Sequence, residues 1–188
     1  IMAFFGAPVR HEDDALQSVL AGLEMAEALD AFNAGQRASG GPEFHIGVGI
    51  NYGVVTVGNI GCEKKMNYTV IGDMVNLASR LEGLTKMYHQ PLLFSESVYL
   101  KVKDALPCRQ VDTVAVKGKT KGVRIYTARR RVEGPEAEAW ALHSSALERY
   151  YDRDFRGAIA GLEKVQGLLK DDYASELFLE RARRYDKA

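Results

Sequence analysis

Asn76 and Arg80 are the residues of this chain whose types and spacing could do chemistry. They stand four residues apart near the start of a predicted helix, so both side chains share one helix face. An Asn amide donates and accepts hydrogen bonds, and an Arg guanidinium carries a permanent charge that can bridge two phosphate oxygens. Such a pair could hold a sugar and a phosphate. The two residues taken alone also fit an ordinary solvent-exposed helix face.

The composition is that of an ordinary globular protein, with 46% hydrophobic and 27% charged residues among 188. Because 25 basic residues balance 25 acidic ones, the net charge indicates neither a nucleic acid nor a membrane surface as partner. The two cysteines, Cys62 and Cys108, make no disulfide framework, which favours a reducing compartment such as the cytosol. The sequence has no apolar run of the ~20 residues that crossing a bilayer requires.

The first 130 residues alternate between strand-like and helix-like patterns, which predicts an α+β domain. The predicted strands cover residues 1–5, 44–50, 54–57, 68–71, 91–95, 111–116 and 123–127. The predicted helices cover residues 13–33, a stretch from residue 73 onward, and residues 96–103, with a loop at 35–42. We expect the second and third strands to form a hairpin and the last two to form an antiparallel pair. Since the chain begins inside a predicted strand, we also expect a segment before residue 1.

The helix that carries Asn76 and Arg80 has its own sequence signals. Asp73 is a favourable residue for its N-cap, and Leu77 and Leu81 lie on its apolar stripe. In the preceding predicted hairpin, Gly47, Gly49 and Gly58 leave room for another backbone to approach closely, for which sheet packing alone is a sufficient reason.

A second region begins after a linker pattern at residues 129–135. Residues 136–188 read as helical throughout, with helices at 136–151, 155–169 and 173–185. We therefore expect a mixed domain at residues 1–130 and an all-helical extension at 136–188. The expected core of the extension comprises Trp140, Leu142, Tyr150, Tyr151, Phe155, Ala158 and Leu162.

Two other patterns, a phosphate-binding P-loop and a structural zinc site, are excluded by the spacing of their residues. Residues 118–120 end like a phosphate-binding P-loop, but Thr113 stands where that motif needs a Gly, and a strand follows instead of a helix. The loop still presents Lys117, Lys119 and Lys121, which suits phosphate and equally suits a solvated basic hairpin. The His and Cys residues are too scattered for a structural zinc site.

The stretch of residues 67–83 closely resembles the signature of the class III nucleotidyl cyclases, the catalytic domain of adenylate and guanylate cyclases. Residues 47–61 and 116–119 resemble further motifs of that family in the family's order, and the resemblance covers residues 1–128. It implies a ferredoxin-like fold, with a mostly antiparallel sheet flanked by helices. It also implies attack of a ribose 3′ oxygen on the α-phosphate of a nucleoside triphosphate, which yields a cyclic nucleotide and pyrophosphate.

The resemblance also implies roles for single residues. Arg80 would stabilise charge at the α-phosphate, and Asn76 would orient the ribose. Lys119, and less favourably Lys117, would contact the terminal phosphates. Thr69 falls where the family reads the purine, and a Thr there goes with adenine, so the expected substrate is ATP and the expected product cyclic AMP.

The family works as a homodimer with shared sites and with two divalent ions, Mg²⁺ or Mn²⁺. By the resemblance, the aspartates that hold these ions and a purine-selecting Lys precede residue 1. The alternatives are a guanylate cyclase and a catalytically inactive cyclase-like module that dimerises as a scaffold.

The helical extension resembles a degenerate tetratricopeptide-like segment. Barely one and a half such units are present, so we expect it to pack on the catalytic domain or on a protein partner. The expected location is cytoplasmic, including the cytosolic part of a larger or membrane-anchored protein.

Overall fold

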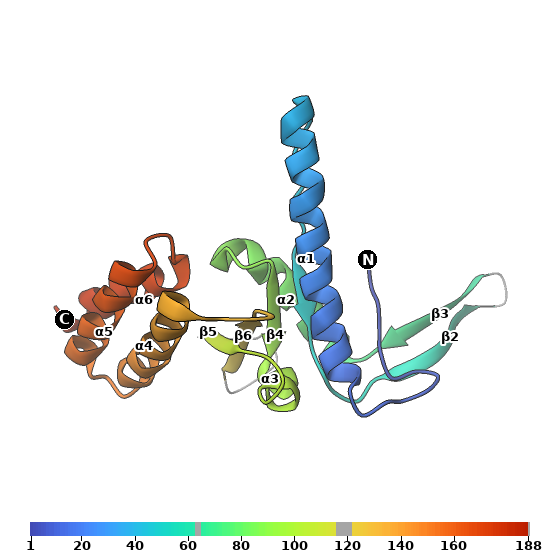
Figure 1. Ribbon diagram of the computed structural model, residues 1–188. Helices are drawn as coiled ribbons and strands as arrows, with labels where there is room; N and C mark the ends of the chain where they lie inside the picture. The colour runs from blue at the N-terminus through green and yellow to red at the C-terminus, as the bar shows by residue number, and fades with distance from the viewer. Residues whose placement is uncertain (63–64, 116–121, 188) are drawn as a thin grey trace. The chain divides into compact units, whose positions relative to one another are not determined.

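The computed structural model describes residues 1–62, 65–115 and 122–187 (Figure 1). The chain divides into two compact units. The mixed unit comprises Ile1–Cys108 and Asp112–Arg130, and the helical unit comprises Arg109–Val111 and Arg131–Ala188. The fold is α+β with a C-terminal helical extension, as predicted.

The strands that the structure describes form two sheets. One has the order β1 (Val48–Ile50), β4 (Leu92–Ser95), β6 (Val123–Ala128) and β5 (Cys108–Val114). In it β1 runs parallel to β4, and β4 runs antiparallel to β6. The other is an antiparallel pair of β2 (Thr56–Cys62) and β3 (Lys65–Ile71), with Thr56 opposite Ile71. The mixed unit also contains helices α1 (Asp14–Ser39), α2 (Asp73–Tyr88) and α3 (Glu96–Val102).

Strand β4 lies at the centre of the mixed unit's core. All four of its residues are buried, which explains why this stretch is apolar without alternation. Val19 and Leu23 of α1 and Val98 of α3 pack in the same cluster as Leu92 and Phe94. Burial of these side chains is what fixes α1 and α3 on the sheet.

Helix α1 continues six residues beyond the predicted end at residue 33 and includes Gly35, which the sequence placed in a loop. The continuation is reasonable because Gln36, Arg37 and Ala38 are good helix formers, which offset one glycine. The helix ends where Gly40 adopts a left-handed conformation with φ of 71°.

Two predictions for the strands are wrong. Residues 1–5 do not form a strand. A strand needs hydrogen bonds to a neighbouring strand, and the described strands pair with one another and not with this segment. The predicted hairpin of 44–50 with 54–57 is also absent from the described residues, since β1 pairs with β4 and β2 with β3. Residues 51–53, which would have formed the hairpin turn, contact α3 instead. There the carbonyl of Tyr52 accepts a hydrogen bond from the Ser97 hydroxyl at 2.7 Å.

The helical unit contains α4 (Gly134–Tyr151), α5 (Phe155–Leu168) and α6 (Tyr173–Asp186), which match the three predicted helices within two residues. The Asp154 carboxylate caps α5 by accepting from the Gly157 amide at 2.9 Å. The core of the helical unit includes Leu147, Leu162 and Phe178. Of the expected core residues, Tyr151 is exposed, because it lies in the last turn of α4.

Candidate active site

The turn from β3 into α2 places the predicted site. Strand β3 ends at Ile71, Gly72 turns the chain with φ of 150°, and α2 begins at Asp73. Glycine suits this turn because φ is positive there. The prediction of Asp73 as N-cap is wrong by one residue, since Gly72 occupies the N-cap. Asp73 lies instead in the first turn, where a carboxylate stabilises the helix dipole.

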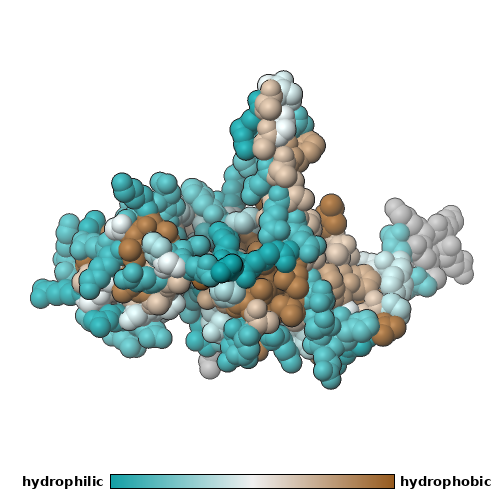
Figure 2. Space-filling model, viewed as in Figure 1, coloured by the Kyte–Doolittle hydropathy of each residue, from teal (hydrophilic) through white to brown (hydrophobic). Residues whose placement is uncertain are grey.

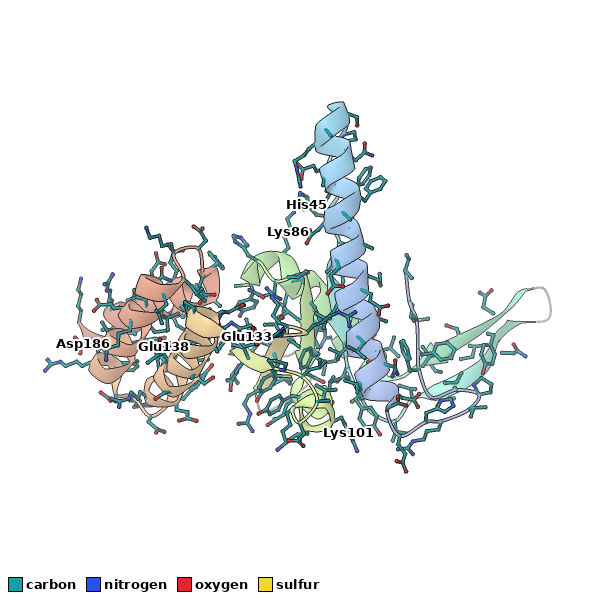
Figure 3. All side chains as sticks on the ribbon, in the orientation of Figure 1. His45, Lys86, Lys101, Glu133, Glu138 and Asp186 are labelled. Carbon is teal, nitrogen blue, oxygen red and sulfur yellow. The ribbon has the colours of Figure 1, made fainter. Side chains whose placement is uncertain are left out.

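Helix α2 has one buried face and one exposed face. Leu77 and Leu81 are buried, whereas Asn76 and Arg80 are exposed. The structure therefore places Asn76 and Arg80 on one accessible face of the helix, as their spacing predicts. Lys86 of the same helix is also exposed and is labelled in Figure 3.

Helix α2 lies directly on the backbone of β1. A Cβ atom added at Gly49 would overlap the carbonyl oxygen of Ala78 and the amide nitrogen of Glu82. A Cβ atom added at Gly47 would overlap the Thr85 hydroxyl. The two glycines thus permit close contact between a strand and a helix, and this contact sets the position of the helix that carries Arg80.

Thr69, the expected purine reader, lies on β3 directly opposite Gly58 of β2 and is half-buried. The glycine leaves open space beside that register position, since no atom of the described chain lies within 4 Å of a Cβ added there. Thr69 precedes the first residue of α2 by four positions, so the site residues come from two consecutive elements.

Lys117 and Lys119 lie outside the described residues. Their segment connects β5, which ends at Val114, to β6, which begins at Val123. These two strands are neighbours in the sheet, in agreement with the predicted pairing of this region.

Within residues 1–62, 65–115 and 122–187, no group of three or more His, Cys, Asp or Glu side chains could hold a metal ion. Among the same residues, none of the helices has the length and apolar composition needed to cross a bilayer.

Asn51 is a residue near the site that the sequence did not single out. Its side-chain amide donates to the carbonyl oxygen of Met74, in the first turn of α2, at 3.0 Å. The signal that could have found it is the period of two along β1, which places residues 47, 49 and 51 on one face.

The helical unit holds a buried polar cluster that the sequence also did not indicate. Arg109 donates to both carboxylate oxygens of Asp172, at 2.8 and 2.6 Å. His143 is fully buried, with Nε2 3.1 Å from the Gln110 carbonyl oxygen. Because a carbonyl only accepts, Nε2 carries the proton, and Nδ1 accepts from Arg109 at 2.9 Å. Ser175 completes the cluster with a hydroxyl 2.7 Å from the same Nδ1.

Burial and the Arg109 charge lower the pKa of His143, so His143 stays neutral. Burial alone would raise the pKa of Asp172, but the hydrogen bonds and charge of Arg109, together with the hydrogen bond from Ser175, outweigh it and lower that pKa below its usual value. The cluster thus consists of one ion pair and one neutral imidazole.

Comparison with known proteins identifies the class of protein to which this fold and this exposed Asn–Arg pair belong. The model of the adenylate and guanylate cyclase catalytic domain family matches residues 1–129, so the chain belongs to this family.

The curated relatives agree with that membership. Adenylate cyclase 1 of Rhizobium meliloti is 41% identical over 129 residues, which are 67% of this chain and 19% of the relative. The adenylate cyclase of Anabaena cylindrica is 41% identical over 113 residues, or 56% of this chain and 22% of the relative. The chain thus spans about a fifth of the length of these two relatives.

Solved structures show the same fold. The adenylyl cyclase CyaB from P. aeruginosa aligns with a TM-score of 0.61 at 37% identity and covers 69% of this chain and 68% of that one. The guanylyl cyclase Cya2 aligns with a TM-score of 0.55 at 35% identity and covers 66% and 62%.

Proposed function

We propose that the protein is an adenylate cyclase, which converts ATP to 3′,5′-cyclic AMP and pyrophosphate. The observation that carries the proposal is the pair Asn76 and Arg80, exposed one turn apart on α2 in a member of the cyclase family. The names of the two 41% identical relatives, both adenylate cyclases, support the choice of reaction.

The proposed chemistry follows from the charges involved. The ribose 3′ hydroxyl gives up its proton to solvent, its oxygen forms a bond to the α-phosphorus, and the bond from that phosphorus to the bridging oxygen breaks as pyrophosphate leaves. Negative charge redistributes on the phosphoryl oxygens during this step, and a fixed guanidinium stabilises it. Arg80 is the residue proposed for this role. Asn76 would hold the ribose by donating to or accepting from its hydroxyls.

Lys119 is proposed to contact the terminal phosphates, with Lys117 as the second candidate. Both belong to the basic segment between β5 and β6. An ammonium on a long side chain can reach a triphosphate and later release the product.

Thr69 is proposed to select adenine. Its position opposite Gly58, with open space beside the pair, supports access of a base to this part of the hairpin. A hydroxyl can donate to and accept from the edge of a purine. The similarity to a guanylyl cyclase keeps GTP as the second candidate substrate.

The proposed reaction includes divalent ions, because the cyclase family uses them. Mg²⁺ or Mn²⁺ would neutralise the triphosphate and activate the 3′ oxygen. The described residues contain no ligand set for them, so no residue of this chain is assigned to the ions.

The proposed active form is a homodimer with shared sites. Figure 2 shows apolar side chains on the surface of α1 and beside it. Exposed apolar residues of the mixed unit include Met25, Phe32, Tyr68 and Ile71, and surface of this kind favours association with another chain. A cytoplasmic location and a protein partner for the helical extension remain expectations from the sequence.

The testing experiment is a cyclase assay of the full-length protein with ATP or GTP and Mn²⁺, comparing wild type with Arg80→Ala. Formation of cyclic AMP that depends on Arg80 supports the proposal. If neither cyclic nucleotide forms, the scaffold alternative takes its place, and formation of cyclic GMP alone overturns only the assignment of Thr69.

A further inference from the structure

One face of β1 and its continuation follows helix α2 along most of its length. Gly47 lies against Thr85, near the end of α2, and Gly49 lies against Ala78 and Glu82. Asn51 reaches Met74 in the first turn. Strand periodicity puts residues 47, 49 and 51 on the same side, so a single stripe contacts α2 from its last turn to its first.

The stripe changes character along its length. At Gly49 the contact is backbone against backbone, and at Gly47 the strand backbone faces the Thr85 side chain and the Glu82 carbonyl. These contacts fix the distance between strand and helix. At Asn51 the contact is a hydrogen bond of 3.0 Å from the side-chain Nδ2 atom to the Met74 carbonyl oxygen. The first four N–H groups of a helix have no partner within the helix, so the first turn is less firmly held than the middle. The bond from Asn51 to the Met74 carbonyl therefore adds an external tie at an end that can fray.

Asn51 is itself held by the end of the neighbouring strand β4 and by the start of α3. Its Oδ1 atom accepts from the hydroxyl of Ser95 at 2.6 Å and from that of Ser97 at 3.3 Å. Ser95 is the last residue of the buried strand β4, and its side chain is buried. The orientation of the amide is therefore set, because Oδ1 faces the two hydroxyls and Nδ2 faces the helix.

We propose that Asn51 is a positioning residue for the cyclase reaction. It ties the first turn of α2 to the core at the junction of β4 and α3. Asn76 follows Met74 by two residues, so the bond fixes the backbone from which the proposed ribose-binding side chain projects. Arg80 lies one turn further, between Ala78 and Glu82, which Gly49 already holds. The role of Asn51 rests on the proposed function of Asn76 and concerns the geometry of α2 rather than contact with nucleotide.

If Asn51 acts through its hydrogen bond to Met74, variants that keep or remove this bond should differ, whereas a role in packing alone would not distinguish them. Asn51→Asp keeps an acceptor for Ser95 and Ser97 but removes the donor to Met74. Asn51→Ala removes both. Ser97→Ala removes the 3.3 Å contact with the Asn51 Oδ1 atom and the bond to the Tyr52 carbonyl but leaves the bond from Asn51 to Met74 in place, so it is the matched control.

The experiment measures kcat and KM for ATP in the full-length protein for these three variants, with the thermal unfolding midpoint of each. Asn51→Asp and Asn51→Ala are expected to lower kcat about tenfold or more with KM within about twofold, because misplacement of a catalytic group lowers the rate of the chemical step. Ser97→Ala is expected to retain the wild-type kcat.

A double-mutant cycle separates positioning from general stability. In an Asn76→Ala background, Asn51→Asp is expected to change kcat little while lowering the unfolding midpoint as much as it does in wild type. Hydrogen exchange at the amides of residues 75–78 is expected to be faster in Asn51→Asp, which reports on the first turn without any assay of activity.

The outcomes are distinguishable. An active wild type whose Asn51→Asp variant keeps its kcat, or in which Asn51→Asp and Asn76→Ala act additively, overturns the positioning role and leaves the proposed function standing. A folded wild-type protein that forms no cyclic nucleotide overturns both. If Asn51→Ala does not fold, Asn51→Asp and its exchange rates decide alone.

Discussion

Asn76 and Arg80 project from the same exposed face of α2, while Leu77 and Leu81 anchor the neighbouring face in the core. The helix thus buries these two leucines and leaves an amide and a guanidinium exposed one turn apart. Because both side chains rest on the same rigid element, their separation is set by the helix and not by a loop. This relationship is the basis of the proposed cyclase activity.

Specific activity should fall as the protein is diluted. If each site needs groups from two chains, then dissociation of the dimer removes the activity rather than halving it. The measurement is cyclic AMP formed per chain across a dilution series, together with the oligomeric state at each concentration. Constant specific activity in a sample shown to be monomeric would contradict shared sites.

Thr69→Cys should shift the preference from ATP toward GTP. A thiol is a weaker hydrogen-bond donor and acceptor than a hydroxyl, so contacts to adenine weaken. The ratio of kcat/KM for ATP to that for GTP should fall about tenfold, equivalent to about 1.4 kcal/mol. Thr56→Cys, on the exposed start of β2, is the matched control and should leave the ratio unchanged. An unchanged ratio in Thr69→Cys would remove Thr69 from base recognition.

Gly49→Ala should destabilise the mixed unit by about 1–3 kcal/mol, because the new methyl overlaps the backbone of α2 at Ala78 and Glu82. Gly83→Ala is the matched substitution within α2, where a Cβ meets open space. It should stabilise by about 0.5–1 kcal/mol, since alanine favours helix. Urea unfolding of the two variants measures both. Equal effects of the two substitutions would show that α2 does not press on β1.

The sequence predicted the elements whose signals are local. Helix α2, strand β4 and the three helices of the extension follow from periodicity and turn residues, and so does the shared face of Asn76 and Arg80. Strand partners were less predictable, because β1 pairs with β4 across a long stretch of chain, and no local pattern distinguishes this from a hairpin.

The candidate site divides in the same way. Thr69, Asn76 and Arg80 were found through a continuous motif. Asn51 was missed because its partners, Met74, Ser95 and Ser97, come from three other segments and are brought together only by the fold. The buried cluster of Arg109, His143 and Asp172 was missed for the same reason.

The helical unit should lose stability on acidification. His143 has a lowered pKa in the folded chain, so the unfolded chain takes up the proton first, at its ordinary pKa of about 6.5. Stability is therefore complete above that pH and falls by about 1.4 kcal/mol per pH unit below it. The lowered pKa of Asp172 acts in the same direction below its unfolded pKa of about 3.9.

Fluorescence of Trp140, which is the one Trp of the sequence and belongs to the helical unit, can follow this loss in urea at pH 7.5 and 5.5. His143→Gln should remove most of the pH dependence between these values. His45→Gln, at an exposed position labelled in Figure 3, should preserve it. A pH dependence that survives in His143→Gln would show that other groups cause it.

Cyclic AMP formation by Arg80→Ala tests the central claim most directly. The full-length protein is assayed with ATP and Mn²⁺ beside wild type and Lys86→Ala, which removes an exposed cation from the same helix. The account predicts that Arg80→Ala loses activity by about 100-fold or more, the size expected for loss of a group that stabilises transition-state charge, while Lys86→Ala keeps the wild-type rate. Equal activity of Arg80→Ala and wild type, or no cyclic nucleotide from ATP or GTP in any of the three proteins, would contradict it.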